Sequence, residues 1–312
     1  MNERHVVVGA GPVGLATAEL LVEQGKEVVL VSRSGAGPEV HGVRREAADV
    51  ADAGRLTELA EGATALYNCV NPPSYTVWPE FWPPVAAAFL EAAEWTGAVL
   101  VTAAALYPYG PVDEPMVEGL PDAASTKKAL IRAGMWVEAK RRHEAGRISA
   151  VEVRGSDYVG PRVSTSTGHI ARVAPAALEG KTVRVFGRPD QLHSFTDVRD
   201  MARALVLVAG EPSAWGRVWH APTNAAKTQT EVLQDVAASV GRTIGKVKSM
   251  PHALLSVGGV VVPMLRELRE TEYQFAAPYV LDSSDIEKTF GLSPTPWAEV
   301  CRATAENALQ AS

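Results

Sequence analysis

The chain of 312 residues is 46% hydrophobic and 21% charged, and its formal net charge is −6. This composition is ordinary for a globular protein with a full core, and the negative charge argues against a general nucleic-acid binder. Cys69 and Cys301 provide neither a disulfide framework nor metal-ligand spacing. We expect no cleavable leader, because the apolar residues near the N-terminus begin a strand, and the apolar stretch at residues 254–265 is shorter than the roughly 20 residues of a membrane span. We therefore expect a cytoplasmic protein with no metal, membrane or nucleic-acid partner.

The first half of the chain alternates between strand-like and helix-like segments. Short β-branched runs at residues 5–8 and 27–31 flank a segment with helical periodicity at residues 13–24, and Gly25 follows it at a position that favours glycine. Further buried strands are expected at residues 65–70, 98–102 and 148–154, with helices at 84–94 and 125–144. This alternation predicts an α/β fold with a Rossmann-type, doubly wound parallel sheet.

The pattern changes after about residue 162, where short elements and Gly/Pro turns replace the regular alternation. A helix is expected at residues 228–240, opened by the capping box of Thr228 and Glu231, and another at residues 296–309. We therefore expect two parts. The first is a dinucleotide-binding core over residues 1–165 with a return segment near 193–210, and the second is a smaller substrate-binding lobe formed mainly by residues 166–312.

Aromatic residues and prolines alternate after the strand at residues 65–70. Tyr75, Trp78, Phe81 and Trp82 lie among several prolines, which interrupt helices. We expect a loop here. It would be either a lid over an apolar substrate or a loop packed on itself.

The segment Gly9-Ala10-Gly11-Pro12-Val13-Gly14 follows a predicted strand and opens a predicted helix. In this context the first glycine permits a tight turn, and the second allows the backbone to approach a pyrophosphate. The third allows the helix and strand to pack closely, and the helix N-terminus offers free N–H groups. The sequence therefore predicts a dinucleotide site at Gly9, Gly11, Pro12, Val13 and Gly14.

The second predicted strand ends in Ser32, Arg33 and Ser34. A site that prefers NAD usually has an acidic residue here, which binds the 2′-hydroxyl of the adenosine ribose. A guanidinium flanked by two hydroxyls instead suits a 2′-phosphate, so the sequence predicts NADP as the cofactor. The alternative is that Arg33 is only a solvated loop charge. Asp49 and Val50 are expected to contact the adenine.

Several later segments match the pattern of a known family. Residues 67–71 (YNCVN) take the place of its strand-end motif near the cofactor, and residues 101–107 (VTAAALY) resemble its Ser-Ser-x-x-Val-Tyr stretch. Residues 154–161 (RGSDYVGP) resemble its Arg-x-x-Asn-x-Tyr-Gly-Pro loop, and residues 195–202 (FTDVRDMA) resemble its Tyr-Val-x-Asp-Val-Ala segment. Residues 292–297 (LSPTPW) resemble its closing motif. The chain resembles an atypical extended short-chain dehydrogenase/reductase of the NAD-dependent epimerase/dehydratase family over nearly its whole length. The resemblance implies that Cys69, Val70 and Asn71 lie at the cofactor.

The catalytic positions of that family are only partly kept. The resemblance through residues 125–129 places its lysine on Lys128 but its tyrosine on Ala124. Its serine falls on Ala103, with Thr102 beside it, and its nucleotide-binding arginine appears as His193. Because an alanine cannot donate a proton to a developing oxyanion, the family's usual mechanism needs another acid.

Tyr107 and Tyr109 are the candidate replacements, because they follow the strand that carries Thr102 and a phenol is the group that was lost. The resemblance implies that Lys128 holds the nicotinamide ribose. Purely structural roles remain open for three of these residues: Tyr107 packs in the interior, Lys128 is a surface charge, and Cys69 is a small buried hydrophobe. We expect the site where residues 11–13, 68–71, 102–109 and 156–159 converge at the carboxyl edge of the sheet.

These features predict an NADP(H)-dependent oxidoreductase that acts on a small organic carbonyl or enone substrate. The alternatives are an enzyme similar to sugar-nucleotide epimerases and dehydratases, a non-redox cyclase or lyase, and a non-catalytic NADP-binding sensor. The resemblance also implies a homodimer that forms through the helices near residues 84–95 and 125–144.

Overall fold

The structure is a computed structural model that describes residues 3–72, 74–166, 168–250 and 270–311. The chain divides into two compact units. The first unit comprises Met1–Pro108, Lys127–Arg154 and Met201–Ala221, and the second comprises Tyr109–Thr126, Gly155–Asp200 and Pro222–Ser312. The apolar stretch at residues 254–265 lies outside the described residues. Among the helices that are described, none has the length and hydropathy needed to cross a membrane.

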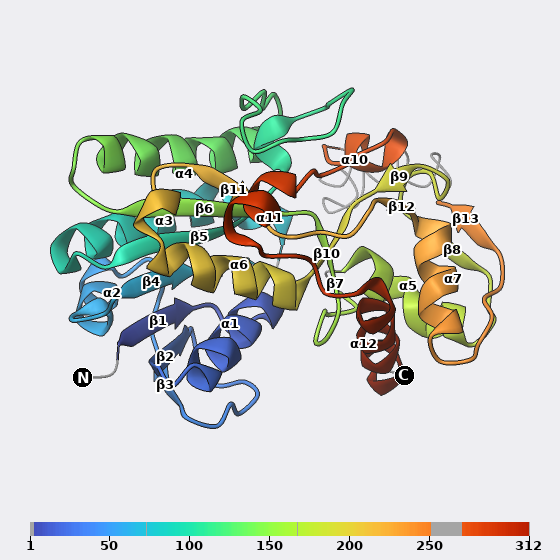
Figure 1. The fold of residues 1–312 in the computed structure, drawn as a ribbon, viewed down its shortest axis with the longest axis horizontal. Coiled ribbons are helices and arrows are strands. Elements are labelled where there is room, and N and C mark those ends of the chain that lie inside the picture. The colour runs from blue at the N-terminus through green and yellow to red at the C-terminus, as the bar shows by residue number, and fades with distance from the viewer. Residues whose placement is uncertain (1–2, 73, 167, 251–269, 312) are drawn as a thin grey trace. The chain divides into compact units, whose positions relative to one another are not determined.

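A seven-stranded parallel sheet forms the centre of the first unit (Figure 1). The strand order β11-β6-β5-β4-β1-β2-β3 places β1 between β4 and β2, so the chain winds outward in both directions. The predicted doubly wound Rossmann-type sheet is therefore confirmed. Its strands are β1 Arg4–Val8, β2 Glu27–Ser32, β3 Val43–Ala47, β4 Ala65–Asn68, β5 Val99–Ala105, β6 Ala150–Gly155 and β11 Val218–His220.

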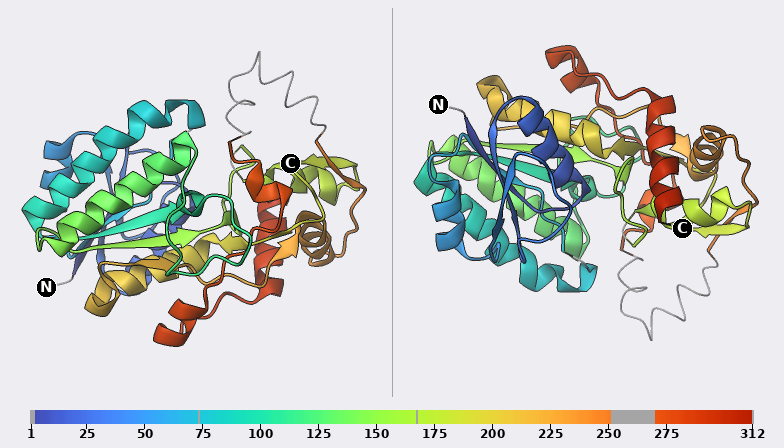
Figure 2. Two further views of the ribbon diagram at one scale, coloured as in Figure 1. Left: turned by 90° about the horizontal axis from the view of Figure 1, so that it is seen from above. Right: turned by 90° about the horizontal axis from the view of Figure 1, so that it is seen from below.

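Helices cover both faces of this sheet. Figure 2 shows α3 and α4 on one face and α1 and α6 on the other. The helices that contribute to the first unit are α1 Pro12–Glu23, α2 Ala53–Ala60, α3 Trp78–Thr96, α4 Lys127–Glu144 and α6 Val198–Gly210, with short 3-10 helices η1 Tyr75–Val77, η2 Tyr107–Tyr109 and η3 Pro212–Ala214. The sheet is apolar on both faces because both are covered, which explains the continuous runs of buried valine and leucine in β1 and β2.

The register of the strands aligns their carboxyl ends. Val8 lies opposite both Val31 and Asn68, and Asn68 lies opposite Thr102. The loops that follow β1, β2, β4 and β5 therefore start at one edge of the sheet. Open parallel sheets bind their ligands at this edge.

The prediction of a loop at the aromatic and proline-rich segment is wrong. Trp78 begins α3, and Pro79, Pro83 and Pro84 all lie within its first two turns. Trp78 and Trp82 are buried in the core cluster beneath this helix. A proline in the first turn removes no helical hydrogen bond. For the two later prolines, we attribute helix formation to the burial of the tryptophans.

The second unit contains short strands and an apolar cluster between helices. Its strands pair as β10-β7, β12-β9 and β13-β8, and the cluster draws on α5, α7 and α12. The predicted capping box of Thr228 and Glu231 is present at the start of α7. The elements are β7 Asp157–Val159, β8 Val183–Val185, β9 Leu192–His193, β10 Phe195–Asp197, β12 Lys227–Thr228, β13 Val247–Ser249, α5 His169–Leu178, α7 Gln229–Ala238, α10 Tyr273–Ala276, α11 Ser284–Phe290 and α12 Trp297–Gln310.

The division of the chain at residue 165, with a return segment near 193–210, stays a prediction about folding domains. The compact units have other limits. The first unit is interrupted between Arg154 and Met201, and residues 109–126 also belong to the second unit.

Candidate active site

The loop between β1 and α1 has the shape of an anion cradle. Gly9 has a φ of +110°, and a Cβ on it would lie 2.5 Å from the carbonyl oxygen of Cys69. A Cβ on Gly14 would lie 1.8 Å from the carbonyl oxygen of Gly9, so only glycine allows this approach. A Cβ on Gly11 would meet no described atom within 4 Å, and α1 begins at the next residue without a side-chain cap. The loop therefore fits a pyrophosphate, which needs open space and free N–H groups.

The turn after β2 is held by the two predicted serines. Ser32 donates a hydrogen bond to the carbonyl oxygen of Ala36 at 3.3 Å, and the Ser34 hydroxyl accepts one from the Ala36 N–H at 3.3 Å. The serines thus shape the turn, whereas Arg33 between them is exposed. This arrangement leaves the guanidinium available to a ligand.

Arg45 in β3 fixes the loop that follows this turn, and sequence reasoning missed it. Its guanidinium donates to the carbonyl oxygens of Gly37 at 2.5 Å, Pro38 at 2.7 Å and Ala36 at 3.2 Å.

Asp49, expected at the adenine, is exposed and accepts a hydrogen bond from the Ala51 N–H, so it also shapes a turn. Val50 packs against the core cluster.

The residues after β4 line the same edge of the sheet. Burial raises the pKa of the Cys69 thiol to about 12, so Cys69 is neutral at physiological pH and is no nucleophile. The side chain of Asn68 accepts a hydrogen bond from the Val70 N–H at 3.2 Å, which fixes the turn. Val70 is partly buried, and Asn71 is exposed.

Tyr107, Tyr75 and Lys128 come together in the first unit. The phenol oxygens of Tyr75 and Tyr107 are 2.8 Å apart, and the Lys128 ammonium lies 5.2 Å from the centroid of the Tyr75 ring. Trp78 packs against both phenol rings, with centroid distances of 5.1 Å to Tyr75 and 5.6 Å to Tyr107. Lys128 is buried rather than a surface charge. Tyr75 was not among the predicted site residues. Its contact with Tyr107 joins the short helices η1 and η2, and no motif in the sequence links these two segments.

Tyr109 and Ala124 belong to the second unit. The Tyr109 side chain is buried, whereas Tyr107 is partly exposed. The predicted segment at residues 156–159 also belongs to the second unit, while residues 11–13 and 68–71 and Thr102 lie in the first. Of the two tyrosine candidates, Tyr107 is therefore the one that shares a unit with the glycine loop.

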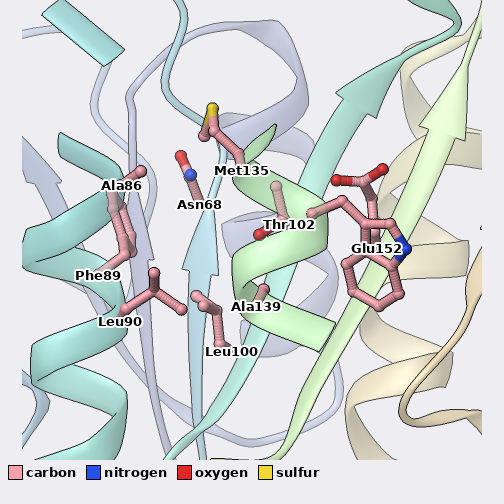
Figure 3. A pocket seen from close by; sticks show the side chains of 10 residues that line it. Asn68, Ala86, Phe89, Leu90, Leu100, Thr102, Met135, Ala139 and Glu152 are labelled. Atoms are coloured by element: carbon pink, nitrogen blue, oxygen red, sulfur yellow. The ribbon is translucent and has the colours of Figure 1, made fainter. Parts of the chain in front are cut away.

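Thr102 lines a small cavity beneath α3 and α4 (Figure 3). The cavity has a volume of about 20 Å³, which is enough for a single water molecule. Its polar lining consists of Asn68, Thr102 and Glu152, and Glu152 also accepts a hydrogen bond from the buried Arg154 at 2.8 Å. This cavity is too small for an organic substrate.

A second polar cluster lies wholly in the second unit and was missed as a group. The Nε2 atom of His193 is 2.7 Å from one carboxylate oxygen of Asp157, and the Nε2 atom of His169 is 3.4 Å from the other. The sequence had marked His193 only as the replacement of a family arginine. No spacing rule links residues 157, 169 and 193, so only the fold could show the cluster.

The pattern of the NAD dependent epimerase/dehydratase family matches residues 5–220 of the chain. The chain belongs to this family. The resemblance predicted from the sequence is therefore confirmed. No curated protein matches the chain by sequence.

Solved structures of similar fold extend over the whole chain. MoeE5 in complex with UDP-glucuronic acid and NAD is 20% identical, with a TM-score of 0.80 and complete coverage of both chains. The UDP-glucose 4-epimerase of Thermus thermophilus in complex with NAD is 20% identical, with a TM-score of 0.77 over 99% of this chain and 100% of that chain. The dTDP-glucose 4,6-dehydratase of Bacillus anthracis in complex with NAD is 14% identical, with a TM-score of 0.79 over 99% and 97%.

These likenesses establish the fold. Membership of the family favours the epimerase or dehydratase interpretation over that of an enone reductase. The alternative from the sequence thus has better support than the leading hypothesis.

Proposed function

We propose that the protein is an NADP(H)-dependent enzyme of the epimerase/dehydratase type, which acts on a hydroxyl-bearing carbon of a small sugar-like substrate. The observation that carries this proposal is the hydrogen bond between Tyr107 and Tyr75, whose ring faces the Lys128 ammonium, in the same unit as the glycine loop. The family's usual tyrosine and lysine supply a phenol supported by an ammonium, and here Tyr75 links the phenol of Tyr107 to the buried Lys128.

Residues at the sheet edge would hold the cofactor. Gly9, Gly11 and Gly14 leave room for the pyrophosphate at the start of α1. Arg33 would pair with the 2′-phosphate, on a loop that Arg45 ties down through three carbonyl oxygens. When bound, the nicotinamide supplies reversible hydride transfer.

Tyr107 would act as the acid and base. If the Tyr75 hydroxyl donates a hydrogen bond to the Tyr107 oxygen, that oxygen is stabilised as a phenolate, which can accept the proton of a substrate hydroxyl. The positive charge of Lys128 next to Tyr75 favours the same state. The phenol of Tyr107 can later return the proton, so the pair serves both directions of the reaction.

Family membership supports this proposal over a carbonyl or enone reductase, a cyclase or a sensor. The neighbours crystallised with UDP-glucuronic acid or with NAD suggest a sugar nucleotide as the substrate class. We also propose a homodimer formed through α3 and α4.

The proposed function is tested by a single-turnover panel. Enzyme in excess over NADP⁺ is mixed with UDP-glucose, UDP-galactose, UDP-glucuronic acid or dTDP-glucose, and NADPH fluorescence and sugar NMR are recorded. We expect transient NADPH or an altered sugar with at least one compound. The proposal is wrong if calorimetry detects no NADPH binding, or if NADPH binds and no compound in the panel changes.

A further inference from the structure

The side chain of Arg132 lies in the interior of the first unit. Arg132 is on α4, one helical turn after Lys128, and it is only 7% exposed. Burial of a charged guanidinium costs free energy, which its contacts within the protein must offset. The contacts of Arg132 reach β5 and α3, so this one side chain joins three elements of the first unit.

Towards β5, Arg132 binds the backbone. Its guanidinium donates a hydrogen bond to the carbonyl oxygen of Ala103 at 3.1 Å. The strand ends two residues later at Ala105, and η2 begins at Tyr107. The hydrogen bond therefore fixes the end of the strand from which the chain continues to Tyr107.

Towards α3, Arg132 lies over an aromatic ring. Its Cζ atom is 4.4 Å from the ring centroid of Trp82. Trp82 packs edge to face against Trp78, with a centroid distance of 5.9 Å and an interplanar angle of 90°. Trp78 packs against Tyr107 in the same way, at 5.6 Å and 84°. Trp82, Trp78 and Tyr107 thus form an aromatic row, and Arg132 covers the ring at its inner end.

The elements that Arg132 joins are those that carry the proposed acid and base and its supporting groups. Tyr107 is in η2, which follows β5, and Tyr75 is in η1, which directly precedes α3. Lys128 is on α4 itself, and its ammonium faces the Tyr75 ring at 5.2 Å. Trp78, the middle ring of the aromatic row, also packs against Tyr75 at 5.1 Å. A displacement of Arg132 would therefore disturb both phenols.

We propose that Arg132 is a positioning residue for Tyr107. Its guanidinium holds the end of β5 and the aromatic row together, and it thereby keeps the Tyr107 phenol at hydrogen-bond distance from Tyr75. A lysine cannot make both contacts, because an ammonium lacks the planar face and the fork of a guanidinium. This inference rests on the proposed function only in taking Tyr107 as the acid and base.

The position of the two phenols is measured by NMR on the full chain without cofactor or substrate, with carbon-13 in the tyrosine rings. Tyr75→Phe, Tyr107→Phe and Tyr273→Phe assign three signals. We expect Arg132→Gln and Arg132→Lys each to shift the signals of Tyr75 and Tyr107, because the rings move. The signal of Tyr273, which belongs to the second unit, should stay in place.

The matched control is Arg141→Gln. Arg141 is exposed on the same helix and is paired with Glu138 at 2.7 Å. Its replacement should leave both tyrosine signals unshifted. If circular dichroism shows that Arg132→Gln does not fold, Trp82→Phe tests the aromatic row from α3, with the same expected shift of the Tyr107 signal.

Single-turnover kinetics with a compound from the nucleotide-sugar panel give the second readout. Both Arg132 variants should slow the reaction at saturating substrate by about tenfold or more, because a small misplacement of a reacting group is costly. The substrate concentration at half-maximal rate and the affinity for NADPH should not change. Arg141→Gln should react at the wild-type rate.

An unshifted Tyr107 signal in folded Arg132→Gln overturns the inference, even if that variant is less stable in urea, because Arg132 then acts on stability alone. Wild-type signals and rate in Arg132→Lys also overturn it, since the charge would then suffice. Failure of the proposed function is distinguishable. If the tyrosine signals shift as expected and no compound in the panel reacts, Arg132 does hold Tyr107, and the assignment of Tyr107 as acid and base is wrong.

Discussion

Arg33 is the residue on which the choice between the two dinucleotides depends. It is exposed at the end of β2, between two serines that bond into the turn. Arg33→Ala should weaken NADPH binding about tenfold or more, because hydrogen bonds between charged groups contribute about 1.5–3 kcal/mol, and should leave NADH binding unchanged. Fluorescence titration of both cofactors measures the effect, with Arg44→Ala on the exposed side of β3 as the control. Tighter binding of NADH than NADPH by the wild type would contradict the proposed preference.

Cys69 gives a prediction about pH. Its pKa is raised from 9.0 to about 12 by burial, so the folded state keeps the thiol protonated where the unfolded chain has lost the proton. The contribution to stability is complete below pH 9 and is lost as the pH rises from 9 to about 12. In the native protein, Cys69 should resist iodoacetamide at pH 8, and it should react after unfolding in guanidinium. Rapid modification of Cys69 in the native protein, located by mass spectrometry, would show that the thiol is accessible and ionised.

Single residues at the site were predicted unevenly. The glycine loop and Lys128 are tied to short motifs, so the sequence indicated them. Tyr75 and Arg45 act through contacts with segments that the motifs do not include, and these contacts exist only once η1, η2 and β3 are in place. Asp157 lies in the loop motif at residues 154–161, but no motif links it to His169 or His193.

At the scale of elements, α3 is the clearest test of what holds the first unit together. Trp82 is 1% exposed, and the Arg132 guanidinium lies 4.4 Å from its ring centroid. Trp82→Ala should lower the free energy of unfolding by about 3–5 kcal/mol, as expected for the loss of a large buried aromatic side chain. The control Glu91→Ala, at an exposed position on the same helix, should have little effect. Equal effects of the two changes in urea denaturation would mean that Trp82 does not anchor the helix.

Periodicity predicted the long elements and missed the short ones. The strands β1, β2, β4, β5 and β6 and the helices α1, α4, α7 and α12 lie where the pattern placed them. β3 was indicated without bounds, as a short strand-like stretch before Asp49, because the charged residues of VRREA hide its alternation. The start of α3 was misassigned, because the proline rule was applied to Pro79, which lies in a first turn where proline is tolerated, and to Pro83 and Pro84, where the buried tryptophans stabilise the helix.

At the scale of the whole molecule, the proposed homodimer depends on the outer surface of α3 and α4. Leu130 and Val137, seven residues apart on α4, are exposed, as is Trp95 at the end of α3. Light scattering at micromolar concentration should give twice the chain mass of 33.1 kDa, and Leu130→Glu with Val137→Glu should halve it. A wild-type mass of one chain would refute the dimer.

The overall fold followed from the sequence because alternating strands and helices with a glycine-rich first turn leave few other arrangements. The reaction did not follow, because it depends on side chains whose neighbours are set by the fold. With Ala124 in place of the family tyrosine, the sequence left Tyr107 and Tyr109 as equal candidates. The partners of Tyr107 in the first unit now favour it.

The central claim is that Tyr107 replaces the missing tyrosine, and the most direct test is single-turnover kinetics on Tyr107→Phe and Tyr109→Phe. With a compound from the nucleotide-sugar panel, Tyr107→Phe should slow the reaction by about 10²-fold or more, because it removes the acid and base. NADPH binding should be unchanged in both variants, and Tyr109→Phe should react at the wild-type rate because its phenol is buried in the second unit. A Tyr107→Phe variant that keeps the wild-type rate would contradict the account.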